Sequence, residues 1–188
     1  MPDRWWTRLI SRSDGAKPVR FIMIDTSPMI ASYRDTDSYM HDHEGGINDE
    51  YDRVEEQMEW LEAQLAIPEE VKIVVGHHPA FSYMDYGSEN RKFLETRVVA
   101  LLEKYEVLAY FAGHDHNLQF AQPRLRSTSY FVSGAGSRLR DGPVKTAVNE
   151  FHFYYVVHGF LACTIDDEQL TVAAVDMYGK LLNHIVVP

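Results

Sequence analysis

The chain has 188 residues, 45% of them hydrophobic, and a formal net charge of -10 at pH 7. This length and apolar content suit one domain with a sizeable core, and no apolar run approaches the roughly 18 residues of a membrane span. The acidic balance argues against nucleic acid and against an anionic membrane as partners, because both attract basic surfaces.

The cysteine content and the N-terminal stretch bear on the cellular compartment. A single cysteine, Cys163, cannot form an internal disulfide, so cysteine usage points to no oxidising compartment. The opening stretch MPDRWWTRLI lacks the basic segment and long apolar run of a signal peptide. Trp5 and Trp6 instead suggest a strand already inside a fold, and hence an internal start. The sequence therefore assigns no localisation.

Strands and helices alternate along the first part of the chain. The apolar patterns predict, in order, a strand over 21–25, an amphipathic helix over 54–65, a strand over 72–78 that breaks at Gly76, a helix over 94–105 and a strand over 107–116. Such alternation implies parallel strand pairing with helices packed on the sheet.

The last third changes texture, with strand-like runs and few helical signals. SYFVSGAG, FHFYYVVHGFLACTID and LTVAAVDMYGKLLNHIVV predict antiparallel strands, with a turn at 178–180. We therefore expect an α/β fold over residues 1–188 as a single domain, with a mixed β-sheet flanked by helices and C-terminal antiparallel strands.

Three histidines lie just past the ends of predicted buried strands. His77 follows VVG, and His114 and His116 lie in GHDHN. Ligands of open α/β sheets bind outside the carboxyl ends of the strands, and imidazole is a common ligand of first-row divalent metals. A shared metal site is favoured over three ordinary strand-end histidines.

Other polar residues have weaker claims. His78 follows His77, so its side chain should point away from the metal and support the ligands. Asp25 lies at a strand end, where a capping role is at least as likely as metal binding. His41 and His43 lie in a polar loop and are read as solvated, and the default for the strand histidines is a packed or surface role (His152, His158, His184).

At this point the sequence resembles a known family. VVGHHP and GHDHN resemble the Val-x-x-His and Gly-His-x-His motifs of calcineurin-like metallophosphoesterases. FIMIDT, EWLEAQL, LAYFAGHDHNLQF and SGAG narrow the resemblance to purple acid phosphatases of the tartrate-resistant type, from about Trp5 to Val187. The implied fold is part of a layered metallophosphoesterase sandwich.

The resemblance implies roles for individual residues. His77 and His114 would bind the divalent metal and His116 the ferric ion of a dinuclear centre containing Fe with Fe, Zn or Mn. Asp85 falls where an acidic residue stands near the leaving group, whereas Tyr86 replaces the family's histidine. His78, Tyr86 and Asn117 would support the ligands or contact substrate.

The family's earlier motifs are absent from the sequence. Asp-x-Gly, Gly-Asp-x-x-Tyr and Gly-Asn-His, which supply the carboxylates, do not occur, so the chain resembles the C-terminal portion of such a domain. The resemblance implies metal-dependent hydrolysis of phosphomonoesters by a parent enzyme, with little activity in this chain alone. Alternatives are a non-catalytic metal-binding or interaction module, and a phosphodiesterase of the same superfamily.

Partners follow from these expectations. The expected substrate is a small phosphomonoester or a phosphoprotein, with neither nucleic acid nor membrane bound. A sheet edge uncovered by the missing half would favour self-association. The family is mostly secreted or periplasmic.

Overall fold

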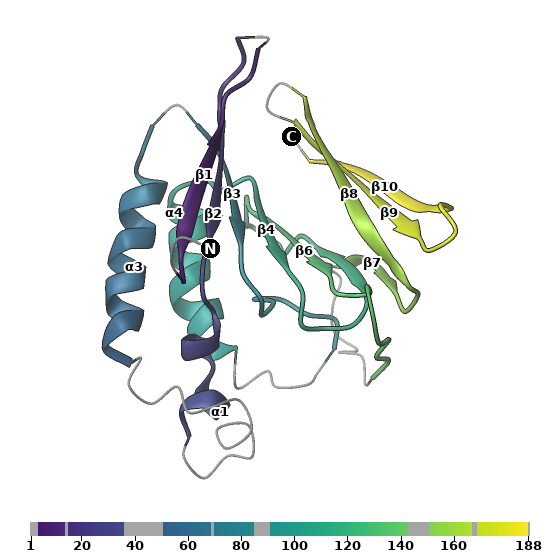
Figure 1. The fold of residues 1–188 in the computed structure, drawn as a ribbon, viewed down its shortest axis with the longest axis horizontal. Helices are drawn as coiled ribbons and strands as arrows, with labels where there is room; N and C mark the ends of the chain where they lie inside the picture. The colour runs from purple at the N-terminus through teal and green to yellow at the C-terminus, as the bar shows by residue number, and fades with distance from the viewer. Residues whose placement is uncertain are drawn as a thin grey trace.

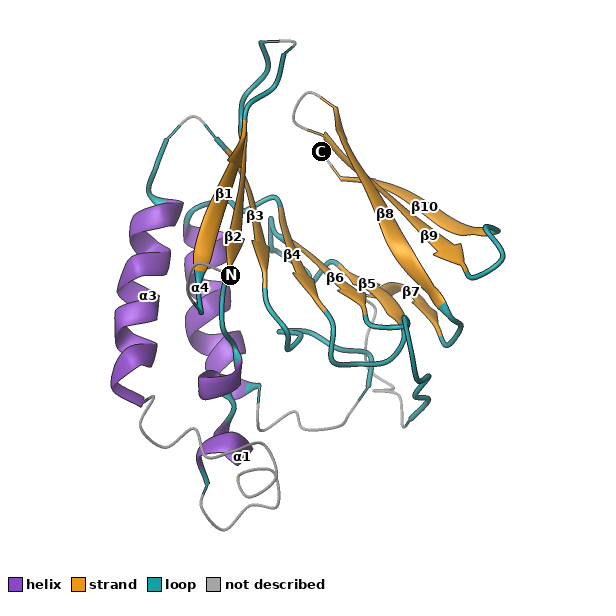
Figure 2. Ribbon diagram, in the orientation of Figure 1, coloured by secondary structure: helices purple, strands orange, loops and turns teal. Residues whose placement is uncertain are grey.

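The computed structural model describes residues 4–13, 15–35, 51–68, 70–84, 91–142, 151–166 and 169–187. Its strands form two sheets, one of seven strands and one of three (Figures 1 and 2). The larger sheet has the order β1-β2-β3-β4-β6-β5-β7. Its strands are β1 (Trp6–Ile10), β2 (Val19–Met23), β3 (Val71–Val75), β4 (Ala109–Ala112), β5 (Leu118–Ala121), β6 (Ser129–Ser133) and β7 (Phe151–Tyr155).

Parallel strands form the centre of this sheet. β2 pairs in parallel with β3, β3 with β4, and β4 with β6, whereas β1, β5 and β7 are attached by antiparallel pairing. The carboxyl ends of β2, β3, β4 and β6 therefore meet at one edge. The loops that leave this edge carry the candidate site.

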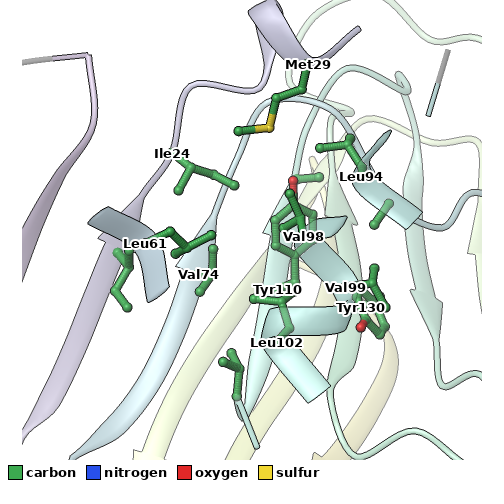
Figure 3. Packing of buried hydrophobic residues seen from close by; sticks show 14 of the residues in the cluster. Ile24, Met29, Leu61, Val74, Leu94, Val98, Val99, Leu102, Tyr110 and Tyr130 are labelled. Carbon is green, nitrogen blue, oxygen red and sulfur yellow. The ribbon is translucent and has the colours of Figure 1, made fainter. Parts of the chain in front are cut away.

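Helices cover one face of the larger sheet. The helix α3 (Tyr51–Leu65) lies beside a second helical segment, in which a π-helical turn, η3 (Leu94–Val98), continues into α4 (Val99–Lys104) (Figure 2). The predicted apolar stripe of α3 is buried (Val54, Met58, Leu61 and Leu65). These residues belong to one core with side chains of β3, β4 and the second helical segment, and Figure 3 shows Leu61 of the stripe near Val74 of β3. Two short helical turns, η1 (Ser27–Met29) and α1 (Ala31–Arg34), precede α3.

The smaller sheet packs against the other face. It has the order β10-β9-β8, formed by the antiparallel strands β8 (Gly159–Asp166), β9 (Gln169–Asp176) and β10 (Leu181–Val187). Leu170 and Val172 of β9 join Phe120 and Phe131 of the larger sheet in a second core. Gly179, with φ 81°, closes the hairpin between β9 and β10 within the predicted turn.

The two sheets diverge toward β1 (Figure 1). Side chains from both sheets line an apolar groove. The groove has a volume of about 440 Å³ and includes Phe21 and Met23 of β2, Val75 of β3, and Cys163 and Ile165 of β8. β8 is an edge strand, with a single neighbour among the described residues.

The predicted α/β class, with a mixed sheet, flanking helices and C-terminal antiparallel strands, is confirmed. The predicted boundaries need correction where polar residues follow the strands. β3 ends at Val75, at the predicted break before Gly76, whereas β4 covers only Ala109–Ala112 and β2 ends two residues before Asp25. No helix in the described part of the chain is long and apolar enough to cross a membrane.

Candidate metal centre

The site begins where β3 and β4 end side by side. Gly76 donates its backbone N–H to the carbonyl of Phe111 at 3.0 Å, and Gly113 donates to the carbonyl of His77 at 3.0 Å. These bonds carry the parallel pairing one step beyond the strands. His77 and His114 are thereby brought together from positions 37 residues apart, as predicted.

The imidazoles of His77 and His114 bring one nitrogen atom each within hydrogen-bonding distance of the other. Nε2 of His77 lies 3.3 Å from Nδ1 of His114, and the rings are nearly perpendicular, at 82°. Two nitrogens that share one tetrahedral Zn²⁺ at about 2.0–2.1 Å lie roughly 3.3–3.4 Å apart. Burial lowers the pKa of His114 and so favours the neutral form that binds metals. The pair fits a divalent metal of this class.

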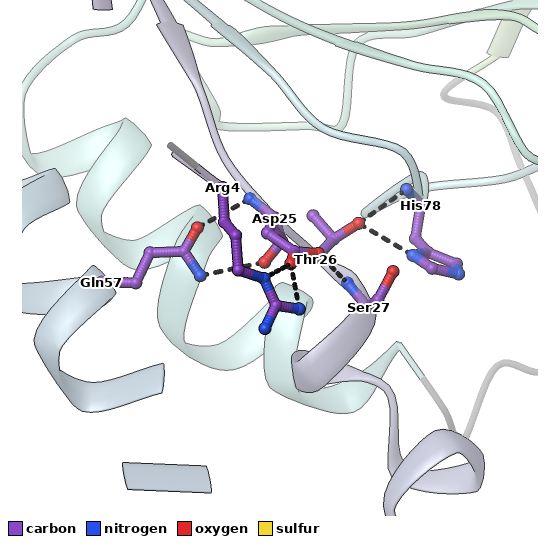
Figure 4. Close-up of polar contacts among 6 residues, drawn as sticks. All are labelled: Arg4, Asp25, Thr26, Ser27, Gln57 and His78. Atoms are coloured by element: carbon purple, nitrogen blue, oxygen red, sulfur yellow. Dashed lines mark hydrogen bonds and ion pairs between the residues drawn. The ribbon is translucent and has the colours of Figure 1, made fainter. Parts of the chain in front are cut away.

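His78 completes a cluster of three histidines whose ligand atoms all lie within 4.8 Å of one another. Its own nitrogens are engaged, because Nδ1 lies 2.8 Å from the hydroxyl of Thr26 and Nε2 lies 3.4 Å from that of Tyr33 (Figure 4 shows the Thr26 contact). The Thr26 hydroxyl also accepts the His78 backbone N–H at 3.0 Å, so it can donate its hydrogen to Nδ1 and leave the ring proton on Nε2. His78 then has no lone pair for a metal.

The environment of His78 keeps it neutral. Burial, followed by the charges of His114 and His77, lowers its pKa to about 3. Its ring packs against both neighbours, with centroids 4.8 Å from His77 and 4.6 Å from His114. His78 therefore belongs to the cluster only by distance, and its contacts favour the predicted supporting role over ligation.

A glycine makes room for this support. The buried hydroxyl of Tyr110 donates to the carbonyl of His78 at 2.7 Å. A Cβ atom on Gly76 would lie 2.7 Å from Cγ2 of Thr26 and would overlap the Tyr110 hydroxyl. Gly76 is therefore needed for close approach rather than for an unusual backbone angle.

The loop that carries His114 is tightly wound. His114 has a positive φ of 58°, a conformation that costs a non-glycine residue about 1–2 kcal/mol. Asp115 donates its N–H to the carbonyl of Gly113 at 2.6 Å, and Asn117 donates to that of Asp115 at 2.8 Å. These bonds hold the strained turn that aims His114 at His77.

His116 lies outside the three-histidine cluster. Its Nδ1 is buried and has no hydrogen-bond partner among the described residues. An unpaired buried nitrogen is costly unless something outside those residues satisfies it. Its assignment to a second metal ion stays a prediction.

Asn117 belongs to a buried polar network below the site. Its Oδ1 accepts from Nε2 of Gln119 at 2.7 Å, and its Nδ2 donates toward the sulfur of Met84 at 3.0 Å. Ser82 in turn donates to the carboxylate of Asp115. The network ties the loop of His114 to residues 79–84, which end directly before Asp85.

Several predicted residues do not join this arrangement. Asp85, Tyr86, His41 and His43 lie outside the described residues. Asp25 forms an ion pair with Arg4 at 2.6 Å and accepts a hydrogen bond from the N–H of Ser27 at 3.0 Å (Figure 4). These contacts support its reading as a residue that caps a strand end.

The remaining histidines lie on other elements. His152 is on β7, where it stacks on Phe120, His158 precedes β8, and His184 is on β10.

Sequence reasoning missed Thr26, Tyr33 and Tyr110, which hold His78, and also Arg140, whose N–H donates to the carbonyl of His116 at 3.0 Å. Thr26 directly follows Asp25 beyond a predicted strand, which was an available signal. Tyr110 lies within an apolar run and Tyr33 within a polar stretch, and neither position gave such a signal.

A mixed α/β sandwich with a histidine pair at the carboxyl ends of parallel strands is an arrangement suited to holding a metal ion. Comparison with known families makes the assignment specific. The profile of the family described as "Calcineurin-like phosphoesterase" matches residues 15–118. The chain belongs to the calcineurin-like phosphoesterase family.

Relatives within the family are acid phosphatases. The chain is 34% identical to tartrate-resistant acid phosphatase type 5 of Homo sapiens over 140 residues, which are 70% of this chain and 42% of that protein. It is 28% identical to purple acid phosphatase 3 of Arabidopsis thaliana over 193 residues, covering 97% of this chain and 50% of that protein. The resemblance to this branch is thus confirmed, and the chain spans about half the length of these curated relatives.

Solved structures support the fold. A structure described as "GAP50 the anchor in the inner membrane complex of Plasmodium" superposes with a TM-score of 0.74 at 22% identity, over 100% of this chain and 55% of that one. The purple acid phosphatase PPD1 from yellow lupin (Lupinus luteus) gives a TM-score of 0.65 at 16% identity, over 97% of this chain and 32% of that one.

Proposed function

We propose that this chain supplies the histidine half of a dinuclear metal site that hydrolyses phosphomonoesters in the acid phosphatase manner. The observation that carries the proposal is the 3.3 Å separation of the His77 and His114 nitrogens at the carboxyl edge of parallel strands. A bound divalent metal would supply Lewis acidity toward a phosphoryl oxygen. Iron with a second iron, zinc or manganese is the proposed pair.

In this proposal the residues have separate tasks. His77 and His114 hold one ion, and His116, outside their cluster, faces the second. His78 keeps the pair oriented through its bonds to Thr26 and Tyr33. Asp85 is proposed for the leaving-group side, with Tyr86 beside it in the chain.

Metal binding by the purified chain tests the proposal. Zn²⁺ binding is measured by calorimetry for the parent, His77→Ala and His114→Ala. His152→Ala is the matched control, because this histidine lies on β7 and stacks on Phe120 instead of joining the cluster. We expect each site variant to weaken binding at least about tenfold, and the control to match the parent.

The alternatives give different results. A non-catalytic module that does not use this site would bind Zn²⁺ equally well after His114→Ala, which would refute the proposal. A phosphodiesterase would hydrolyse bis-p-nitrophenyl phosphate faster than p-nitrophenyl phosphate when a parent enzyme that contains this chain is assayed. We expect the 188-residue chain alone to bind metal weakly and to hydrolyse little.

A further inference from the structure

The segment that follows β6 runs directly beside the histidine loop. Gly134 donates its N–H to the carbonyl of Asn117 at 3.0 Å, and Arg140 donates its own to the carbonyl of His116 at 3.0 Å. The side-chain amide of Asn117 reaches back to the carbonyl of Arg140 at 3.5 Å. These bonds fix the backbone of Arg140 against the loop that carries the metal ligands.

The side chains of this segment face different ways. Leu139 is half-buried and packs on the second core, whereas Arg138 and Arg140 on either side of it are exposed. Because the backbone of Arg140 is bonded to the loop of His116 and Asn117, its exposed side chain begins beside that loop. An anchored leucine thus holds an arginine at the rim of the site.

The carboxylates closest to Arg140 along the chain and in the loop have other partners. Asp141 accepts the N–H of Gly142 at 2.9 Å and the hydroxyl of Tyr154 at 3.2 Å. Asp115 is buried and accepts from Ser82. No ion pair of Arg140 occurs among the described residues. Its charge remains available at the site of a chain whose net charge is -10.

We propose that Arg140 binds the phosphoryl group of the substrate and selects dianionic phosphomonoesters over monoanionic phosphodiesters. The planar guanidinium matches two phosphoryl oxygens at once, and its attraction grows with the charge of the anion. A single cation at the rim also offsets the repulsion that an acidic protein exerts on a phosphorylated substrate. This inference rests on the proposed function, because it uses the same site.

The test measures ligand binding rather than turnover. Phenylphosphonate, a non-hydrolysable dianion at pH 8, and diphenyl phosphate, a monoanion, are titrated into the metal-free and the zinc-loaded chain and followed by NMR. The variants are Arg140→Gln and Arg140→Lys. Arg124→Gln is the matched control, because Arg124 is equally exposed but lies between β5 and β6, at the opposite end of these strands.

We expect Arg140→Gln to weaken phenylphosphonate binding about tenfold or more and to weaken the binding of diphenyl phosphate by a clearly smaller factor, because the monoanion carries half the charge. Arg140→Lys should fall between, since an ammonium keeps the charge but loses the two-point contact. Arg124→Gln should remain within about twofold of the parent, since only the general charge changes.

Failure of this inference can be told apart from failure of the proposed function. Equal affinities of the parent and Arg140→Gln, an equal loss in Arg124→Gln, or no phenylphosphonate binding by the parent would each overturn the role of Arg140, while Zn²⁺ binding through His77 and His114 could stand. Loss of phenylphosphonate binding on Arg140→Gln in a chain that binds no Zn²⁺ would instead support the anion site and refute the metal site.

Discussion

Adding one methyl group at Gly76 should destabilise the fold and disturb the support of the site. The new Cβ atom would lie 2.7 Å from Cγ2 of Thr26 and would overlap the hydroxyl of Tyr110. Both neighbours are 1% exposed and have little room to move. Overpacking a core of this kind costs about 1–3 kcal/mol.

Displacing the Tyr110 hydroxyl would also break its 2.7 Å bond to the His78 carbonyl. A buried carbonyl left unpaired costs about 1–3 kcal/mol more. We therefore expect Gly76→Ala to lower the free energy of unfolding by about 2–6 kcal/mol, a large share of the 5–15 kcal/mol typical of a domain.

Urea unfolding followed by tryptophan fluorescence measures this loss, and a double-mutant cycle with Tyr110→Phe tests its cause. Removing the hydroxyl relieves the closest overlap, so Gly76→Ala should cost at least about 1 kcal/mol less in the Tyr110→Phe background. Gly136→Ala is the control, because a Cβ atom there meets nothing within 4 Å, and it should change stability by less than about 0.5 kcal/mol. A Gly76→Ala loss below about 1 kcal/mol, or two strictly additive changes, would refute this reasoning.

Gly134→Ala should destabilise the fold more than Gly76→Ala, because its Cβ atom would overlap the backbone carbonyl of Asp115, and no side-chain rotation can relieve that overlap. A melting temperature equal to that of the parent would contradict this. The Arg20 guanidinium, which donates to Glu70 at 2.9 Å, holds the pKa of Glu70 below its usual range. The resulting stability is present above the unfolded-state pKa and is lost as the pH falls through the folded-state value, so Glu70→Gln should flatten the acid limb of unfolding free energy against pH; an unchanged limb would count against the pair. We also propose that the edge of β8 beyond Leu161, whose own N–H donates to the Ser133 hydroxyl, pairs with a second copy of the chain. Size-exclusion chromatography should then show a dimer at micromolar concentration, whereas a clean monomer would argue against this pairing.

The sequence predicted the parts of the site that depend on strand ends. A glycine after a β-branched run places His77, and the same pattern places His114, so parallel pairing of β3 and β4 was enough to bring them together. The α3 stripe was equally readable, because burial of one helix face repeats every three to four residues.

The sequence could not predict the contacts that depend on three-dimensional close approach. The bond from Tyr110 to His78 joins residues 32 apart and requires an empty volume at Gly76. The bond from Arg140 to His116 depends on how the segment after β6 returns beside the histidine loop. Neither contact leaves a periodic signal, because each joins single residues that are far apart in the sequence.

The positive φ of His114 is unfavourable for the stability of the fold but places its imidazole beside His77. Glycine adopts this conformation without strain, and asparagine tolerates it better than most residues, so either replacement would relieve part of the turn's cost. A lineage of this chain under selection for stability alone would be expected to drift toward such residues at position 114. Retaining an imidazole there trades stability for a nitrogen atom close to His77. Deep mutational scanning should therefore rank glycine and asparagine above histidine when scored for folding, and histidine above both when scored for metal binding.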